Sequence, residues 1–272
     1  MLAFRAYRLA LWLATPGIAA YLLWRAARGR ETLERLSERW GATDVPRPAG
    51  TVIWLHAASV GELFSALPLV EALHAARADA AFLVTTGTRS SARLAAERLP
   101  ARALHQFAPV DHPLAVQRFL RHWRPQAGLI VESELWPTLI EEAERAGCRL
   151  ALVNGRISDR SYRKWSRTRG CAAALLDRFA LVLAQSDGDR ARLAALGAPA
   201  PRALGNLKSA APLLRADAAE VARFRQATAG RPLWIAASTH PGEDEIAVAV
   251  HRRLLARHPE HQTIIVPRHP ER

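Results

Sequence analysis

The residues best placed for chemistry lie in the segment Trp54–Glu62 (WLHAASVGE), where an apolar run gives way to a helical pattern. The run 51–55 is almost continuously apolar, as is typical of a strand covered on both faces of a parallel sheet. Helical spacing follows, with apolar side chains at Leu63, Leu67, Val70 and Leu73. Ligands of open α/β sheets bind at such strand ends, so Glu62 is the expected general base of an enzyme. The alternative is an ordinary acidic residue in the first turn of a helix.

A second pair of carboxylates, Glu132 and Glu134, follows the apolar run 127–131. Residues two apart in an extended chain point to the same side, so both side chains are expected on the side of the sheet edge where ligands bind.

Two further strand ends carry polar residues that could either bind a ligand or cap a helix. Thr88 and Arg89 belong to the stretch 85–91 (TTGTRSS), which suits an anion at a helix start and equally well an N-cap. Arg156 belongs to the stretch 154–162 (NGRISDRSY), which also reads as a capped helix start. Asp187 and Asp189 are interpreted as helix-start residues only.

Polar residues recur after two later runs. His240 and Glu243 follow the run 233–237, and Arg268 and His269 follow the run 263–266. A single histidine is usually a cap or surface residue. The paired placement favours contacts with the phosphate or base of a nucleotide.

The elements that must position these residues alternate along the chain. Apolar runs are expected as strands at 51–55, 81–85, 127–131, 149–153 and 180–184, with helices near 62–76, 89–98, 112–122, 137–146, 161–176 and 187–196. This alternation predicts a doubly wound α/β domain. A proline-containing break at 197–201 precedes a second α/β pattern with two strands. We expect an anchor at 1–30, a first domain at 31–210 and an incomplete second domain at 211–272.

The formal charge of +13 is carried almost wholly by arginine, since Lys164 and Lys208 are the only lysines. Such a surface attracts phospholipid headgroups or phosphorylated substrates. No basic block interleaved with aromatic residues indicates nucleic-acid binding, which we therefore do not expect. Cys148 and Cys171 are too few for a disulfide framework, so a reducing compartment fits best.

The amino terminus has an uncharged stretch, Leu9–Trp24, with arginines on both sides. As a helix it would measure roughly 24 Å, shorter than the roughly 30 Å hydrocarbon core of a bilayer, so it either spans tilted or enters one leaflet. A cleaved signal peptide is the rival reading. More arginines follow the stretch than precede it, which favours an uncleaved anchor with the body of the protein in the cytoplasm.

Eight short motifs occur in order: WLHAASVGE, TTGTRSS, ESELWP, NGRISDRSY, AQSDGD, GNLK, STHPGEDE and VPRHPER. Together they resemble the Kdo (3-deoxy-D-manno-octulosonic acid) transferase family. The resemblance implies a two-domain GT-B glycosyltransferase, with two Rossmann-like domains behind a membrane-anchor helix. It also implies inverting transfer of Kdo from CMP-Kdo to the lipid A precursor lipid IVA at the cytoplasmic face of the inner membrane. The sequence shows no metal-ligand spacing, and neither a metal nor a cofactor is expected.

The resemblance also implies roles for individual residues. Glu62 matches the catalytic base, and Glu132 and Lys208 match residues that stabilise the transition state. Arg268 and His269 match a CMP-binding pair. We further expect substrate or nucleotide contacts from Ser59, Gly61, Thr88, Arg89, Arg156, His240 and Glu243.

The chain departs from the family at its end, because family members continue well past Arg272. We therefore expect the 272-residue polypeptide to bind CMP-Kdo poorly and to be weakly active or inactive. Two alternatives remain at this point. One is a membrane-associated GT-B transferase that uses a different nucleotide sugar, and the other is a non-catalytic basic module that binds membranes.

Overall fold

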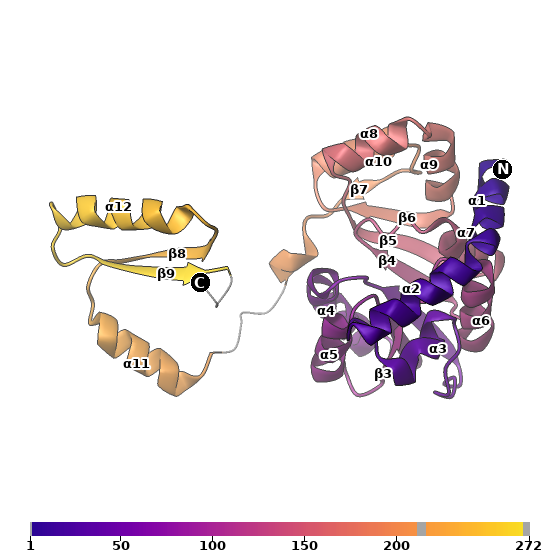
Figure 1. The fold of residues 1–272 in the computed structure, drawn as a ribbon, viewed down its shortest axis with the longest axis horizontal. Coiled ribbons are helices and arrows are strands. Elements are labelled where there is room, and N and C mark those ends of the chain that lie inside the picture. The colour runs from indigo at the N-terminus through magenta and orange to yellow at the C-terminus, as the bar shows by residue number, and fades with distance from the viewer. Residues whose placement is uncertain (1, 211–215, 269–272) are drawn as a thin grey trace. The chain divides into compact units, whose positions relative to one another are not determined.

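The computed structural model describes residues 2–210 and 216–268 (Figure 1). The chain divides into two compact units, unit 1 (Met1–Pro212) and unit 2 (Leu213–Arg272), and each is described by itself.

Unit 1 is built on a seven-stranded parallel sheet with the strand order β3-β2-β1-β4-β5-β6-β7. Its strands are β1 (Thr51–His56), β2 (Ala80–Thr86), β3 (Ala103–Phe107), β4 (Ala127–Val131), β5 (Arg149–Gly155), β6 (Phe179–Ala184) and β7 (Arg202–Ala203). The order runs outward in both directions from β1 and β4. The carboxyl ends of these two strands therefore form the topological switch point, where open α/β sheets bind their ligands.

Helices cover both faces of this sheet. The helices of the body are α3 (Leu36–Arg39), α4 (Val60–Ala76), α5 (Arg89–Arg98), α6 (Pro113–Trp123), α7 (Pro137–Arg145), α8 (Asp159–Ser166), α9 (Arg169–Leu176) and α10 (Asp187–Ala195), with 3-10 turns η1 (Leu33–Arg35) and η2 (Leu207–Ala210). Helices α4 and α5 bury apolar side chains against one face, and α6, α7, α9 and α10 against the other. Trp54 and Ile130, at the centre of the sheet, have no exposed surface. The predicted doubly wound α/β fold is confirmed.

Some local predictions were wrong in detail. Strands β3 and β7 were not predicted. The helix expected over 161–176 is two helices, α8 and α9, separated at Arg167 and Thr168.

The amino terminus forms two helices, α1 (Leu2–Leu13) and α2 (Thr15–Ala27), with a bend of 59° between them. Among the described residues, no single helix has the length and apolar composition to cross a membrane, whereas this bent pair meets both criteria. Polar contacts hold the pair against the rest of unit 1. The Tyr7 hydroxyl donates to Asp111 Oδ2 at 2.9 Å, and Thr15 Oγ1 lies 3.0 Å from His112 Nε2. Arg8 forms an ion pair with Glu142.

Unit 2 contains α11 (Ala218–Thr228), β8 (Leu233–Thr239), α12 (Glu243–Leu255) and β9 (Gln262–Pro267). Strands β8 and β9 pair in parallel. Both of its predicted strands are present. Its apolar core is small: among the described residues of this unit, Ala247 is the only buried hydrophobic residue. Ile235 and Val266, on the two strands, are 52% and 47% exposed.

Candidate active site

Glu62 lies in the first turn of α4, directly after the loop that leaves β1. The loop residue Ser59 is the N-cap, and its hydroxyl accepts a bond from Glu62 N at 3.2 Å. The Glu62 carboxylate in turn accepts two hydrogen bonds from the loop. Glu62 Oε1 accepts from Ser59 Oγ at 2.9 Å, and Oε2 accepts from Ala58 N at 2.7 Å. This reciprocal cap holds the carboxylate at the carboxyl end of β1.

The electrostatic surroundings raise the pKa of Glu62 above its ordinary value. Burial is the largest cause, and the negative charge of Glu134 adds to it, with a smaller contribution from Glu132. The bonds from Ser59 and Ala58 favour the charged form and act in the opposite direction. A raised pKa makes a carboxylate a stronger base, which suits proton abstraction from a hydroxyl group.

We expect Glu134→Gln to lower the pKa of Glu62, because it removes a negative charge that disfavours ionisation of its neighbour. The pKa can be measured from the ¹³C shift of the Glu62 carboxyl group across a pH titration. The exposed Glu97 provides the control, and Glu97→Gln should leave the titration unchanged. An unchanged midpoint in Glu134→Gln would show that the two carboxylates do not interact.

The structure brings Glu132 and Lys208 together, as an ion pair with Nζ 3.7 Å from Oε1. Glu132 has a φ of 57°, a left-handed conformation that is uncommon outside glycine. Its backbone N donates to Val153 O at 3.0 Å, which fixes the turn after β4. Lys208 lies in η2, whose Leu207 N donates to Asn154 Oδ1 at 3.1 Å. Asn154, at the end of β5, thus positions the lysine for this pair.

His56 is a candidate residue of this site that sequence reasoning passed over. It is the last residue of β1 and is 3% exposed, and its Nδ1 lies 3.0 Å from Thr85 Oγ1. Burial lowers its pKa to about 4, so the imidazole is neutral at physiological pH. Its buried Nε2 has no hydrogen-bond partner among the described residues. A histidine that ends an otherwise apolar strand was the sequence signal that could have identified it.

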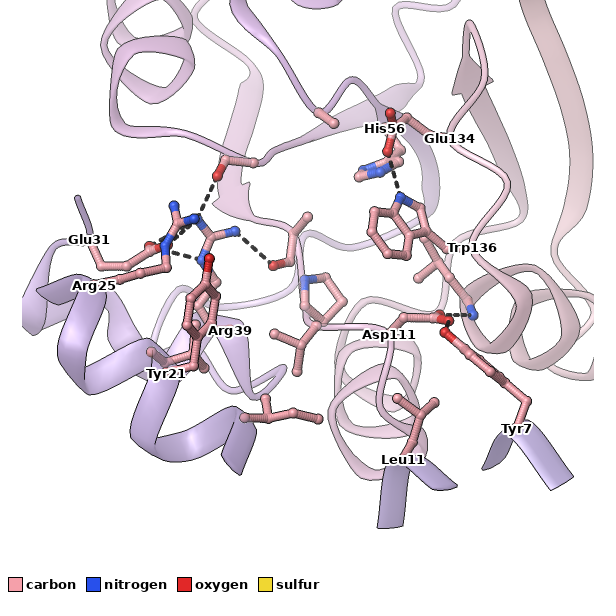
Figure 2. A pocket seen from close by; sticks show the side chains of 18 residues that line it. Tyr7, Leu11, Tyr21, Arg25, Glu31, Arg39, His56, Asp111, Glu134 and Trp136 are labelled. Carbon is pink, nitrogen blue, oxygen red and sulfur yellow. Dashed lines mark hydrogen bonds and ion pairs between the residues drawn. The ribbon is translucent and has the colours of Figure 1, made fainter. Parts of the chain in front are cut away.

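A cavity of about 410 Å³ lies between the N-terminal helix pair and the strand ends (Figure 2). His56, Ala58, Glu134 and Trp136 line it, so the cavity adjoins the loop that holds Glu62. Most of its wall is apolar, with contributions from Leu11, Ile18, Leu22, Pro109, Val110 and Leu139. The Trp136 indole N–H donates to Glu134 Oε2 at 2.5 Å and fixes that carboxylate at the cavity wall.

The opposite part of the cavity wall carries an ion-pair cluster. Arg39 and Arg25 both pair with Glu31, at 2.9 Å each. Figure 2 shows this cluster well separated from His56 and Glu134. The cavity therefore has the carboxylate of Glu134 at one part of its wall and the guanidinium groups of Arg25 and Arg39 at another.

The remaining predicted residues of unit 1 lie at the expected strand ends. Thr88 is the N-cap of α5, and its hydroxyl is engaged in a capping box with Ser91. The capping role of Thr88 is therefore confirmed, while its role in binding stays a prediction. Arg89 donates to Gly29 O. Arg156 and Gly61 are exposed.

The predicted nucleotide-binding residues lie in unit 2. Arg268 N donates to Thr239 O at 3.0 Å, which places Arg268 beside the end of β8. Glu243 Oε2 accepts from His240 N at 2.8 Å, so this carboxylate closes the turn before α12. His269 lies outside the described residues. Contact of these residues with a nucleotide stays a prediction.

The comparisons with known proteins identify the family. The family model described as 3-deoxy-D-manno-octulosonic-acid transferase (Kdo transferase) matches residues 34–211. The chain belongs to the Kdo transferase family. This confirms the resemblance drawn from the eight motifs.

Proteins named 3-deoxy-D-manno-octulosonic acid transferase are similar over almost the whole chain. The probable mitochondrial enzyme of Arabidopsis thaliana is 38% identical over 98% of this chain and 61% of its own length. The Haemophilus influenzae protein is 32% identical over 98% of this chain and 63% of its own length. The chain thus spans somewhat less than two thirds of the length of these relatives.

Solved structures support the GT-B type fold. The UDP-GlcNAc 2-epimerase of Neisseria meningitidis superposes with a TM-score of 0.55, over 79% of this chain and 65% of that chain, at 13% identity. A Staphylococcus aureus MnaA structure with UDP gives a TM-score of 0.51 at 14% identity, over 82% of this chain and 64% of that chain. At these identities the likeness shows the fold alone.

Proposed function

We propose that this Kdo transferase family chain takes part in the transfer of Kdo from CMP-Kdo to the lipid A precursor lipid IVA, with Glu62 as the general base. The observation that carries the proposal is the position of Glu62. It lies at the switch point of the sheet, acted on by the charges of Glu134 and Glu132, beside a largely apolar cavity.

The chemistry follows from these groups. As the acceptor hydroxyl oxygen attacks the anomeric carbon of Kdo, its proton passes to Glu62. The bond between that carbon and the phosphate oxygen breaks, and CMP leaves with the electron pair. A single displacement of this kind inverts the anomeric configuration. The sugar hydroxyl is a weak acid, so a base with a raised pKa lowers the barrier as the proton moves.

Lys208 is proposed to stabilise the negative charge that develops in the transition state. It is about half exposed, whereas Glu132 is 15% exposed, so the ammonium group remains accessible to a bound phosphate. In unit 2, Arg268 and His269 are proposed to contact CMP, as the family resemblance implies.

A lipid acceptor fits the surroundings of the site. The cavity beside Glu134 is largely apolar, and the helix pair that covers it exposes apolar side chains on its outer surface: Leu9 (61%), Trp12 (50%), Leu13 (76%), Leu23 (57%) and Trp24 (43%). Arginines flank these side chains in sequence and favour anionic lipid headgroups. We propose that α1 and α2 hold the protein at the cytoplasmic face of the inner membrane.

The donor is tested by comparing CMP-Kdo with UDP-sugars in a transfer assay on lipid IVA. The assay uses the chain both alone and joined to the complete donor domain of a relative. We expect the joined chain to consume CMP-Kdo and the product mass to rise by whole Kdo units. Preferential consumption of a UDP-sugar would instead support a different GT-B transferase.

A further inference from the structure

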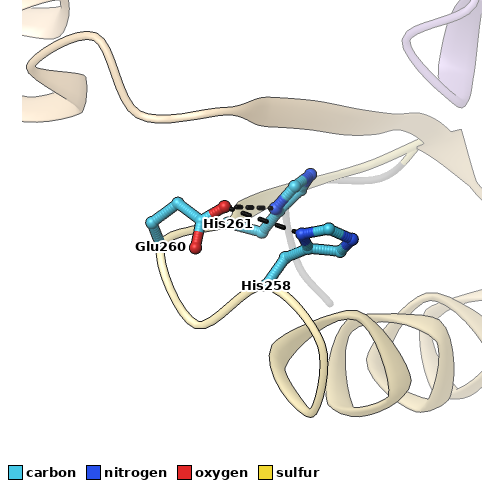
Figure 3. A group of neighbouring side chains, drawn as sticks. All are labelled: His258, Glu260 and His261. Carbon is cyan, nitrogen blue, oxygen red and sulfur yellow. Dashed lines mark ion pairs between the residues drawn. The ribbon is translucent and has the colours of Figure 1, made fainter.

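Two histidines and a glutamate converge in unit 2, before β9, whereas Arg268 follows that strand. His258, Glu260 and His261 lie in the turn between α12 and β9, and one donor atom from each lies within 4.8 Å of the others (Figure 3). Both imidazoles direct Nδ1 toward the same carboxylate oxygen. Glu260 Oε1 lies 3.8 Å from His258 Nδ1 and 3.6 Å from His261 Nδ1.

These two distances are too long for hydrogen bonds, which have donor–acceptor separations near 3 Å. They are close to the separation of two ligands on one metal ion. Zinc binds imidazole nitrogen and carboxylate oxygen at about 2.1 Å, so two ligands of a tetrahedral zinc lie about 3.4 Å apart. Each histidine would therefore have to move only a few tenths of an ångström relative to Glu260 to reach that separation, and all three donor atoms already lie within 4.8 Å of one another.

His261 supplies a separate reason to expect a ligand. Its Nδ1 is inaccessible to water and has no hydrogen-bond partner among the described residues. A buried polar atom without a partner is costly, and a bound cation would remove that cost. The contact with Glu260 Oε1, at 3.6 Å, is too long to satisfy this nitrogen with a hydrogen bond.

The backbone of the turn already holds the three residues in place. His258 N donates to Leu254 O at 2.8 Å, and His261 N donates to His258 O at 3.1 Å. Arg231 Nε donates to Glu260 O at 2.9 Å, which ties the turn to the segment before β8. The three ligand residues are thus already partly ordered, so little conformational entropy would be lost when an ion binds.

We propose that His258, Glu260 and His261 form a binding site for a late first-row divalent cation such as Zn²⁺, with water completing the coordination. Two imidazoles and one carboxylate are a donor set that zinc accepts. The site precedes β9, while Arg268 follows it, so a strand of six residues, roughly 20 Å long, separates the ion from the proposed nucleotide contacts. The ion is therefore structural and ties the end of α12 to β9 in a unit with little apolar core.

The proposal is tested by titrating untagged chain with ZnCl₂ in a calorimeter. We expect one equivalent of zinc to bind, and His258→Ala and His261→Ala to weaken binding by more than about tenfold, because each removes a ligand. His251→Gln is the control in the same unit, since the His251 side chain contacts Thr263 and lies outside the cluster. Its zinc affinity should equal that of the unchanged chain.

Hydrogen exchange provides a second measurement that does not depend on affinity alone. Zinc should increase the protection of amides in β9 and at the end of α12, and it should leave unit 1 unchanged. Circular dichroism verifies that the alanine variants remain folded, as expected for side chains that are 55% and 24% exposed. Absence of zinc binding, or binding that both alanine variants retain at full strength, would overturn the proposal.

Discussion

Glu62→Gln is expected to lower the rate of Kdo transfer by about 10²- to 10⁴-fold, the usual contribution of a positioned general base. The amide cannot accept the proton of the attacking hydroxyl. The fold should be retained, because the cap from Ser59 Oγ to the backbone N of residue 62 does not depend on the carboxylate. The measurement is the rate of product formation from CMP-Kdo and lipid IVA, in the chain joined to a complete donor domain.

Glu71→Gln provides the matched control. Glu71 lies on the same helix, α4, and is exposed. The same chemical change there should leave both the rate and the unfolding midpoint unchanged. Transfer by Glu62→Gln at close to the unchanged rate would exclude Glu62 as the base and would favour the reading of this carboxylate as a helix cap alone.

Gly41→Ala is expected to destabilise unit 1 by more than about 3 kcal/mol. Gly41 has a φ of 76°, which costs an alanine about 1–2 kcal/mol. A Cβ at this position would also lie 1.9 Å from Ala115 O and 2.8 Å from Phe119 N. Both are backbone atoms of α6, so the clash cannot be relieved by turning a side chain. Urea unfolding of the variant and of the unchanged chain measures the difference.

Gly147→Ala separates the clash from the backbone strain. Gly147 has a φ of 80°, and among the described residues nothing lies within 4 Å of an added Cβ. The free energy of unfolding of this variant should fall by only about 1–2 kcal/mol, the cost of the left-handed conformation for an alanine. Equal destabilisation of the two variants would contradict the packing of Gly41 on α6.

The predicted strands of the central sheet were correct because their signal is local. A run of consecutive apolar residues such as 51–55 identifies a strand covered on both faces, whatever its neighbours are. Strand β3 lacks that signal, since it includes His105 and Gln106. These polar groups find distant partners: His105 Nε2 lies 2.9 Å from Thr86 Oγ1, and Gln106 Oε1 accepts from Trp123 Nε1 at 2.5 Å. No local pattern reveals such pairings.

The candidate site likewise has features that local sequence predicts and features that depend on distant contacts. Glu62 could be found from sequence because a strand-to-helix corner places its first-turn carboxylate at a known edge of the sheet. The pairing of Glu132 with Lys208 depends on Asn154, which holds η2 from a different strand. The effect of Glu134 on the pKa of Glu62 likewise needs two loops from separate strands to meet.

The sequence by itself determined the family and the doubly wound order of helices and strands, and it located Glu62, the carboxylate that we propose as the base. These properties follow from motif order and from hydrophobic periodicity, which act over a few residues. The tertiary structure alone decided that α1 and α2 close an apolar cavity beside the loop that holds Glu62, and that a turn in unit 2 gathers two histidines and a glutamate. The physical reason is that contacts such as Tyr7 with Asp111 join residues 104 positions apart, and their formation depends on how whole elements pack.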